Sequence, residues 1–157
     1  MRFEFFRRLT GKDSEHDYLR SLGATTILSR HDTEMGTRPL EKATWAGAVD
    51  PTGGDILAWL TRTMKPGGCI AASGLTAGVE LNTTVLPFIL RGVSLLGIDS
   101  VMCPMERRQE VWNRLATDMK PTHLAAIGSE VTLEGLPDAF QTLLEGQARG
   151  RTVVKLG

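Results

Sequence analysis

The sequence has no surplus of charge of either sign and little cysteine. Eighteen Lys and Arg residues balance eighteen Asp and Glu residues, so no basic surplus is available for a phosphate backbone. This balance argues against general nucleic-acid binding. Cys69 and Cys103 are far apart and do not show the spacing of metal ligands. We therefore expect two free, buried thiols and a cytoplasmic protein.

Long uninterrupted apolar segments are also missing. The N-terminal stretch MRFEFFRRLTGK does not contain the apolar core that a signal peptide needs. The most apolar stretch, VLPFILRGVSLLGI, is interrupted by Pro87, Arg91 and Gly92. A membrane-spanning helix needs a longer run with fewer interruptions, so we expect no membrane association.

Motifs of nucleophilic or metal-assisted catalysis are absent. The chain has no G-x-S-x-G elbow and no cluster of His, Cys and carboxylates at ligand spacing. His31 is next to Asp32, but neighbours of this kind are usually solvated. Tyr18, the single tyrosine, shares a helical face with Leu22, which favours packing over acid catalysis. We therefore expect no catalytic residue and no metal ligand in this chain.

Strand and helix patterns alternate along the whole chain. Strands are expected over 25–28, 46–50, 68–73, 93–99, 127–133 and 151–156, with a tight turn at 65–68. Helices are expected over 15–22, 56–64, 83–92, 104–119 and 136–144. Several strands are continuously apolar, which is typical of a parallel sheet covered on both faces. The pattern predicts an α/β fold with a parallel doubly wound sheet, in a single domain.

The stretch LTGKDSEHDYLRSLGA predicts a strand end, a short polar turn and an amphipathic helix. In dinucleotide-binding folds the loop after the second strand meets the adenosine ribose, where a cation accommodates a 2′-phosphate. Thr10, Gly11 and Lys12 would supply a hydroxyl, a close backbone approach and that charge. Asp13 or Ser14 would cap the helix. Taken alone, the stretch favours a plain strand-to-helix turn over a cofactor site.

Two later segments also have two interpretations each. CIAASGLTAG would place free backbone groups at the carboxyl edge of the sheet, where α/β proteins bind ligands, or it is a loop that needs glycine. LPFILRGVSLLGIDS is either ordinary core or an apolar wall for a nicotinamide ring. In the second case Ile89 and Ser100 would lie at the strand ends where that wall forms.

Four segments together resemble the acrylyl-CoA reductase branch of the zinc-independent quinone oxidoreductases, within the medium-chain dehydrogenase/reductase superfamily. They are RPLEKATWAGAVDPTGGD, GGCIAASGL, NTTVLPFILRGVSLLGIDSVMCPMERRQEVW and QARGRTVVKLG. The resemblance covers about residues 9–157. It implies a Rossmann-like domain that binds NADPH and transfers hydride to an α,β-unsaturated acyl-CoA of the acrylyl-CoA type, or to a quinone-like acceptor.

The resemblance also implies where the cofactor is bound. Lys12 stands where arginine is usual, which keeps the charge but loses the planar fork of a guanidinium. Arg30 would be a second basic contact at the adenosine end, and Gln147 would lie in a segment that reaches back to the cofactor. The implied cofactor-binding residues are Thr10, Gly11, Lys12, Arg30, Leu75, Ile89, Ser100 and Gln147.

Parts of the family pattern have no counterpart in the sequence. The N-terminal GroES-like catalytic domain, the first Rossmann strand, its glycine loop and the first helix are missing, so residues 1–157 are expected to form a partial NADP-binding domain. The proton donor would lie outside this chain. The alternative is a truncated, non-catalytic fragment or an interaction module, and the family implies a homodimer through the edge strand Val93–Asp99.

Overall fold

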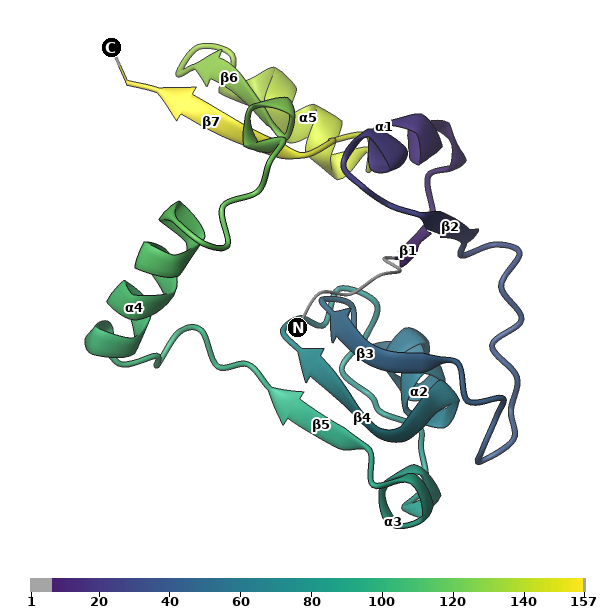
Figure 1. Ribbon diagram of the computed structural model, residues 1–157. Coiled ribbons are helices and arrows are strands. Elements are labelled where there is room, and N and C mark those ends of the chain that lie inside the picture. The colour runs from purple at the N-terminus through teal and green to yellow at the C-terminus, as the bar shows by residue number, and fades with distance from the viewer. Residues whose placement is uncertain (1–6, 157) are drawn as a thin grey trace. The chain divides into compact units, whose positions relative to one another are not determined.

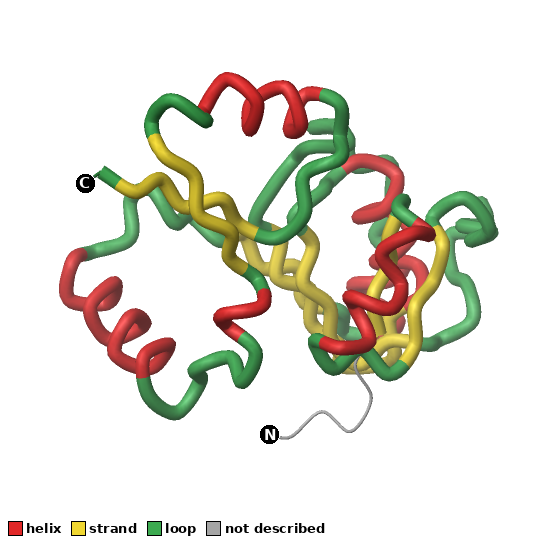
Figure 2. Tube along the Cα trace, turned by 90° about the horizontal axis from the view of Figure 1, so that it is seen from above, coloured by secondary structure: helices red, strands yellow, loops and turns green. Residues whose placement is uncertain are grey.

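The computed structural model describes residues 7–156, in which strands and helices alternate (Figure 1 and Figure 2). By contact density the chain divides into two units, Met1–Cys103 and Pro104–Gly157. The first unit contains β1 (Arg7–Thr10), the 3₁₀ turn η1 (Asp13–Glu15), α1 (His16–Ser21), β2 (Thr26–Ser29), β3 (Trp45–Asp50), α2 (Gly54–Thr63), β4 (Met64–Ala72), α3 (Leu86–Arg91) and β5 (Ser94–Gly97). The second contains α4 (Met105–Ala116), the 3₁₀ turn η2 (Leu124–Ala126), β6 (Gly128–Thr132), α5 (Leu136–Leu144) and β7 (Arg151–Lys155).

Every strand pair in the described residues is parallel, which confirms the predicted α/β class. The strands form three sheets, ordered β1-β2, β3-β4-β5 and β6-β7. The predicted arrangement is a single incomplete sheet. Because no described strand lies between β1 and β3, the sheet of the first unit is divided at that point.

The start of β4 differs from the prediction of a tight turn at 65–68. The strand begins at Met64, and its register on β3 shifts from Trp45 opposite Met64 to Gly47 opposite Cys69. Gly67 has a φ of +71°, which a glycine adopts without strain. The expected turn is therefore an irregular bulge within the strand.

The core of the first unit forms where α2 packs on β4. Apolar residues recur on one face of this helix, so Leu57 and Leu60 are buried beside the fully buried Met64 and Ile70. The rings of Trp45 and Trp59 meet edge to face, with their centroids 5.8 Å apart. Trp45 and Met64 are the first residues of β3 and β4, so this packing includes the amino ends of both strands.

Helix α1 is not capped as expected. Neither Asp13 nor Ser14 caps it, because Glu15 occupies the N-cap position and makes no side-chain cap hydrogen bond. A 3₁₀ turn over Asp13–Glu15 precedes the helix, and Asp13 lies 3.5 Å from His16 Nε2 instead. The prediction of an Asp or Ser cap is therefore wrong.

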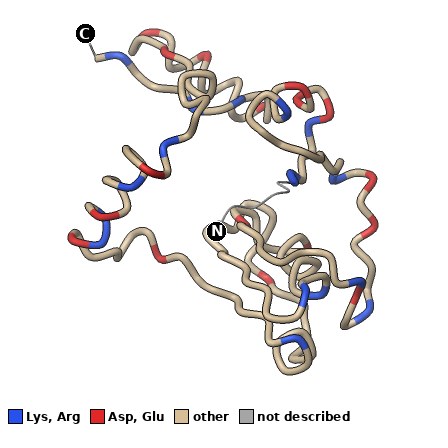
Figure 3. The backbone as a smooth tube through the Cα atoms, viewed as in Figure 1, with Lys and Arg blue, Asp and Glu red and all other residues tan. Residues whose placement is uncertain are grey.

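The second unit forms its own small parallel sheet of β6 and β7. Pro104 is the N-cap of α4, and α5 has the bounds that the sequence predicts. Figure 3 shows acidic and basic residues interspersed along α4. No described residue of this unit is buried. The prediction of one partial domain over residues 1–157 stays a prediction.

Two other expectations concern the cysteines and the membrane. Cys69 and Cys103 are both free, as predicted, but each is half-buried rather than fully enclosed. Among residues 7–156, no helix has the length and apolar character needed to cross a bilayer.

Candidate functional site at the carboxyl ends of the strands

The turn at the end of β1 is held by its own side chain. The Thr10 hydroxyl accepts a hydrogen bond from the Lys12 backbone N–H at 3.1 Å, so it closes the turn locally. Gly11 is exposed, and Lys12 is half-buried. Lys12 follows the carboxyl end of β1 in the sequence. Parallel sheets present their ligand-binding groups at the carboxyl ends of the strands.

Arg30 joins this turn from the end of β2. Its backbone N–H donates to the Thr10 carbonyl at 2.7 Å. Its guanidinium lies against Gly11: a Cβ placed there would be 2.7 Å from Arg30 Nη2. A side chain at this position would displace the guanidinium. The structure thus places Arg30, the basic residue expected at the adenosine end, against the turn of Thr10, Gly11 and Lys12 that is expected at the 2′-phosphate.

His31 also contacts the turn of Thr10, Gly11 and Lys12, a role that its sequence context does not predict. Its Nε2 lies 3.1 Å from the Gly11 carbonyl oxygen, so the imidazole also contacts the turn. Its backbone N–H donates to the Ser29 hydroxyl at 3.3 Å. The sequence signal that could have indicated this contact is the position of His31 directly after Arg30, just beyond the end of β2.

A second cluster forms where β3 ends at Asp50. This carboxylate is 1% exposed and accepts from the Thr52 N–H, the Thr52 hydroxyl and the Gly53 N–H. The Asp50 carbonyl also accepts from the Ser73 N–H at 2.8 Å. A single buried acid therefore shapes the turn into α2 and ties it to the loop after β4. The sequence shows an acid at the strand end but does not reveal this role.

The loop after β4 packs closely on that turn. Ala77 N–H donates to the Thr52 carbonyl at 2.7 Å, and Gly53 and Gly78 form an isolated parallel bridge. A Cβ at Gly74 would collide with the backbone of Pro51. For CIAASGLTAG the structure thus confirms the interpretation as a loop that needs glycine. Leu75, on the same loop, is exposed.

The remaining predicted residues are more dispersed. Ser100 is exposed and follows β5, and its N–H donates to the Ile98 carbonyl at 3.1 Å. Ile89 is exposed within α3, so its expected place at a strand end is wrong. Gln147 is an exposed residue after α5, in the second unit. The structure therefore gathers Thr10, Gly11, Lys12 and Arg30, and leaves Leu75, Ile89, Ser100 and Gln147 outside that cluster.

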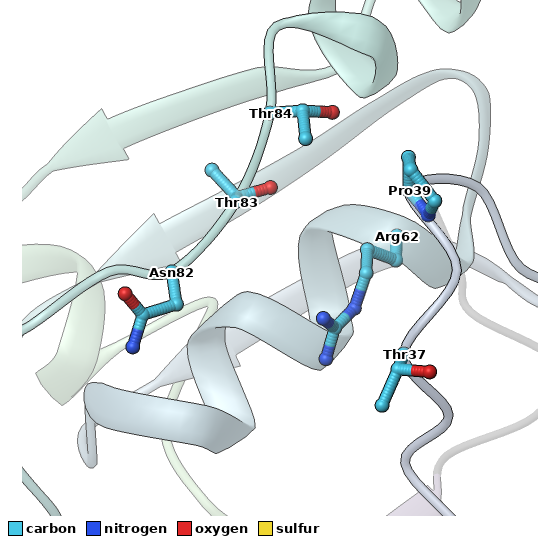
Figure 4. Close-up of a pocket in the computed structure, with 6 residues that line it drawn as sticks. All are labelled: Thr37, Pro39, Arg62, Asn82, Thr83 and Thr84. Carbon is cyan, nitrogen blue, oxygen red and sulfur yellow. The ribbon is translucent and has the colours of Figure 1, made fainter.

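Two open pockets lie elsewhere in the first unit. One, of about 250 Å³, is lined by residues from the loop before β3, the end of α2 and the loop before α3, which are Thr37, Pro39, Arg62, Asn82, Thr83 and Thr84 (Figure 4). The other, of about 270 Å³, is lined by residues of the 34–44 loop together with Trp59 and Thr63. No predicted cofactor residue lines either pocket.

Arginine side chains organise the region of the first pocket. Arg91 donates from Nη1 to the carbonyls of Arg62 and Met64, and from Nη2 to the carbonyl of Glu41. It thereby ties α3 to the end of α2 and to the preceding loop. The Arg38 guanidinium donates to Glu41, and this hydrogen bond holds the pKa of the Glu41 carboxyl below its ordinary value. These contacts stabilise the fold near the amino ends of β4 and β5.

The described part of the chain does not bring together a set of metal ligands. Residues 7–156 contain no group of three or more His, Cys, Asp or Glu side chains placed to hold a metal ion. The parallel sheets and the basic turn after β1 define the class of protein, which is an α/β protein with an incomplete Rossmann-like fold.

Comparison with known proteins narrows this class. No family model matches the chain. It is 51% identical over 149 residues to YhfP of Bacillus subtilis, a protein named as a quinone oxidoreductase, and covers 45% of that protein. It is 48% identical over 147 residues to the acrylyl-CoA reductase AcuI of Ruegeria pomeroyi, and covers 44% of it. The matches include 94% and 93% of this chain.

Solved structures of oxidoreductases also resemble the fold of this chain. The YhdH oxidoreductase of Salmonella enterica, crystallised with NADP, superposes on 98% of the chain with a TM-score of 0.91 and 46% identity. YhfP of Bacillus subtilis, crystallised with NAD, covers 97% with a TM-score of 0.91. In each case the chain spans 47% of the solved protein. The resemblance seen in the sequence is confirmed as a similarity: the chain is similar to these oxidoreductases, and it spans about half of their length.

Proposed function

We propose that this chain is the cofactor-binding part of an NADPH-dependent oxidoreductase. The reaction would be hydride transfer to an α,β-unsaturated acyl-CoA of the acrylyl-CoA type, or to a quinone-like acceptor. NADPH supplies the hydride when it is bound. The observation that carries the proposal is the cluster of Lys12 and Arg30 around Gly11, at the carboxyl ends of β1 and β2.

Within the proposal, each residue of the cluster has a distinct task. Gly11 allows the Arg30 guanidinium to approach the backbone, and Lys12, the next residue in the sequence, adds a second cation to the turn. Two cations at this turn favour a ribose 2′-phosphate over a free 2′-hydroxyl. Leu75, Ile89, Ser100 and Gln147 remain proposed contacts further along the cofactor. No catalytic residue is assigned in this chain, and the proton donor would be supplied from outside it.

The test compares NADPH with NADH. The chain is titrated with each cofactor while the nicotinamide fluorescence is followed, first as wild type and then as Lys12→Ala and Arg30→Ala. Each variant should weaken NADPH binding by roughly tenfold or more, as expected for loss of a charged hydrogen bond, while NADH binding changes little.

Lys65→Ala is the matched control, because this exposed lysine lies at the start of β4 rather than at a carboxyl end. Equal losses for both cofactors would contradict recognition of the 2′-phosphate. Absence of saturable binding to the folded wild-type chain would overturn cofactor binding by this chain alone.

The second candidate is a non-catalytic interaction module that forms a homodimer through the predicted edge strand Val93–Asp99. Its supporting observation is that, among the described strands, β5 has β4 as its one neighbour, and that Leu96 in β5 and Ile98 just after it are exposed. Light scattering on the purified chain tests it. A dimer that Leu96→Asp converts to a folded monomer supports this interface, and a monomeric wild type contradicts it.

The location and extent of the protein complete the proposal. We propose a cytoplasmic protein, supported by Cys69 and Cys103, which form no disulfide in the described part of the chain. We also propose that residues 1–157 act as one partial NADP-binding domain beside a separate catalytic domain.

A further inference from the structure

The Arg62 pocket is the cavity of about 250 Å³ in the first unit that is lined by Thr37, Pro39, Arg62, Asn82, Thr83 and Thr84. Arg62, in the last turn of α2, lies between Asn82 and Thr83 on one side and Thr37 on the other (Figure 4). The lining therefore combines one cation with hydroxyl and amide groups, and it includes no carboxylate. Groups of this kind are suited to an anion that accepts several hydrogen bonds.

The Arg62 guanidinium is not neutralised by a hydrogen-bonded acid among the described residues. Its Nε is buried and has no hydrogen-bond partner within residues 7–156. The charge of Arg62 acts on Glu41, but that carboxylate already accepts from Arg38 Nη2 at 2.7 Å and from Arg38 Nε at 3.1 Å. A charged donor without an acceptor is costly inside a protein. An anion in the pocket would therefore supply the partner that Arg62 lacks.

The arginines around this region outnumber its acid. Arg91 donates to the carbonyls of Arg62, Met64 and Glu41. Carbonyl groups at the end of a helix form the negative end of its dipole, so Arg91 opposes that charge where α2 ends. Arg38, Arg62 and Arg91 thus surround the single carboxylate of Glu41. This balance favours an anionic ligand.

The Thr83 hydroxyl has its proton engaged within the fold. Thr61 donates its own proton to the Ala58 carbonyl at 2.8 Å. The hydrogen bond of 2.8 Å between the hydroxyls of Thr61 and Thr83 must therefore use the proton of Thr83. Toward the pocket, Thr83 can only accept a hydrogen bond.

The other polar groups of the lining can donate. The Thr84 hydroxyl accepts from the Leu86 N–H at 3.3 Å, which leaves its proton available. The Thr37 hydroxyl and the Asn82 amide belong to exposed residues and add further donors. The pocket thus offers a guanidinium, several neutral donors and one acceptor. A singly protonated phosphate group matches this set, because it has oxygens that accept and an O–H that donates.

We propose that the Arg62 pocket binds a phosphate group, either as the free ion or as the ester of a small organic molecule. The two Nη atoms of Arg62 would hold two phosphate oxygens, as a guanidinium fork does. A water molecule takes about 30 Å³ of liquid volume, so the cavity also has room for a small group beside the phosphate.

This site is separate from the turn around Gly11. Arg62 lies just before Met64, where β4 begins, whereas Rossmann-like folds bind the dinucleotide at the carboxyl ends of their strands. The proposal therefore does not depend on cofactor binding, and a phosphate bound at the turn must be distinguished from one bound in the pocket.

The experiment titrates the full chain with inorganic phosphate at constant ionic strength and follows the backbone amides by two-dimensional NMR. We expect saturable shifts at Thr37, Thr83 and Thr84. Absence of saturable shifts at these three amides overturns the proposal. Shifts confined to Gly11 and Lys12 also overturn it, because they would place the phosphate at the proposed cofactor turn.

Arg62→Gln tests the cation. It keeps the backbone carbonyl that accepts from Arg91, and it should weaken phosphate binding by roughly tenfold or more. Arg107→Gln is the matched control, since it removes the same charge from the exposed surface of α4 and should bind as the wild type does. Circular dichroism checks that both variants fold. If folded Arg62→Gln binds as tightly as Arg107→Gln, the site is not the Arg62 pocket.

Three further comparisons define the ligand. Thr37→Val, which removes one exposed hydroxyl, should weaken binding by about threefold to tenfold. Sulfate, which carries no proton at neutral pH, should bind more weakly than phosphate, and equal binding would overturn the assignment to phosphate. Glycerol 3-phosphate binding more tightly than inorganic phosphate supports an ester as the occupant, and weaker binding supports the free ion. Glycerol alone is the control for the organic group.

Discussion

The two units of this chain differ in how they use apolar residues. The first unit buries a continuous cluster around α2 and β4, including Trp59, which is 8% exposed. In the second, Trp112 of α4 is 64% exposed and no described residue is buried. Both units have amphipathic helices and parallel strands, so pattern alone does not produce a core. A short segment encloses little surface by itself.

The largest expected effect compares the two tryptophans. Trp59→Ala should lower the free energy of unfolding by about 3–5 kcal/mol, because it removes a buried ring from the core cluster. Trp112→Ala should change it by less than about 1 kcal/mol, since the ring is already in contact with water. Urea denaturation followed by circular dichroism measures both. Equal losses would show that the second unit has a core of its own.

The next comparison concerns two aspartates. Asp50→Ala should cost about 2–3 kcal/mol, because it leaves the backbone amides of Thr52 and Gly53 without their acceptor. Asp138→Ala, in the exposed first turn of α5, should cost less than about 1 kcal/mol. The same denaturation assay applies, and Asp50→Asn, which keeps one carbonyl acceptor, should fall between them. An unaffected Asp50→Ala would contradict the role assigned to this carboxylate.

Arginine geometry gives a smaller contrast. Arg91→Lys should cost about 1–2 kcal/mol, since an ammonium cannot reproduce the fork that reaches the carbonyls of Glu41, Arg62 and Met64. Arg107→Lys, whose partner Glu110 is 3.8 Å away on the surface of α4, should be within about 0.5 kcal/mol of wild type. Thermal melts resolve the two. A neutral Arg91→Lys would mean that these contacts do not limit stability.

The smallest effect is the pH dependence of two ion pairs. Hydrogen bonds from Arg38 and Arg114 lower the pKa values of Glu41 and Asp118, one in each unit. A lowered pKa in the folded state stabilises above the unfolded-state pKa, and this contribution is lost as the pH falls through the folded-state pKa. Stability should therefore decline slightly below about pH 4. Glu41→Gln and Asp118→Asn should each flatten that decline, and melts from pH 7 to pH 2.5 measure it.

Much of the local structure follows from the sequence. The bounds of α5 agree with its apolar spacing, and the continuous apolar strands predict parallel pairing, which is observed. The basic turn Thr10–Lys12 is recognisable from its place after a strand and before a helix. The capping of α1 was not predictable, because Asp13 contacts His16 instead of a backbone amide. The bulge at the start of β4 was also missed, since KPGG normally turns the chain.

Local periodicity and short motifs in the sequence are enough to predict the α/β class, the order of the elements, the similarity to a group of oxidoreductases and the residues of the basic turn. The contacts of Arg30 and His31 with Gly11, and the joining of two loops by Asp50, become visible only in the folded chain. The physical reason is that these contacts join residues that are distant in sequence, and no local pattern specifies them.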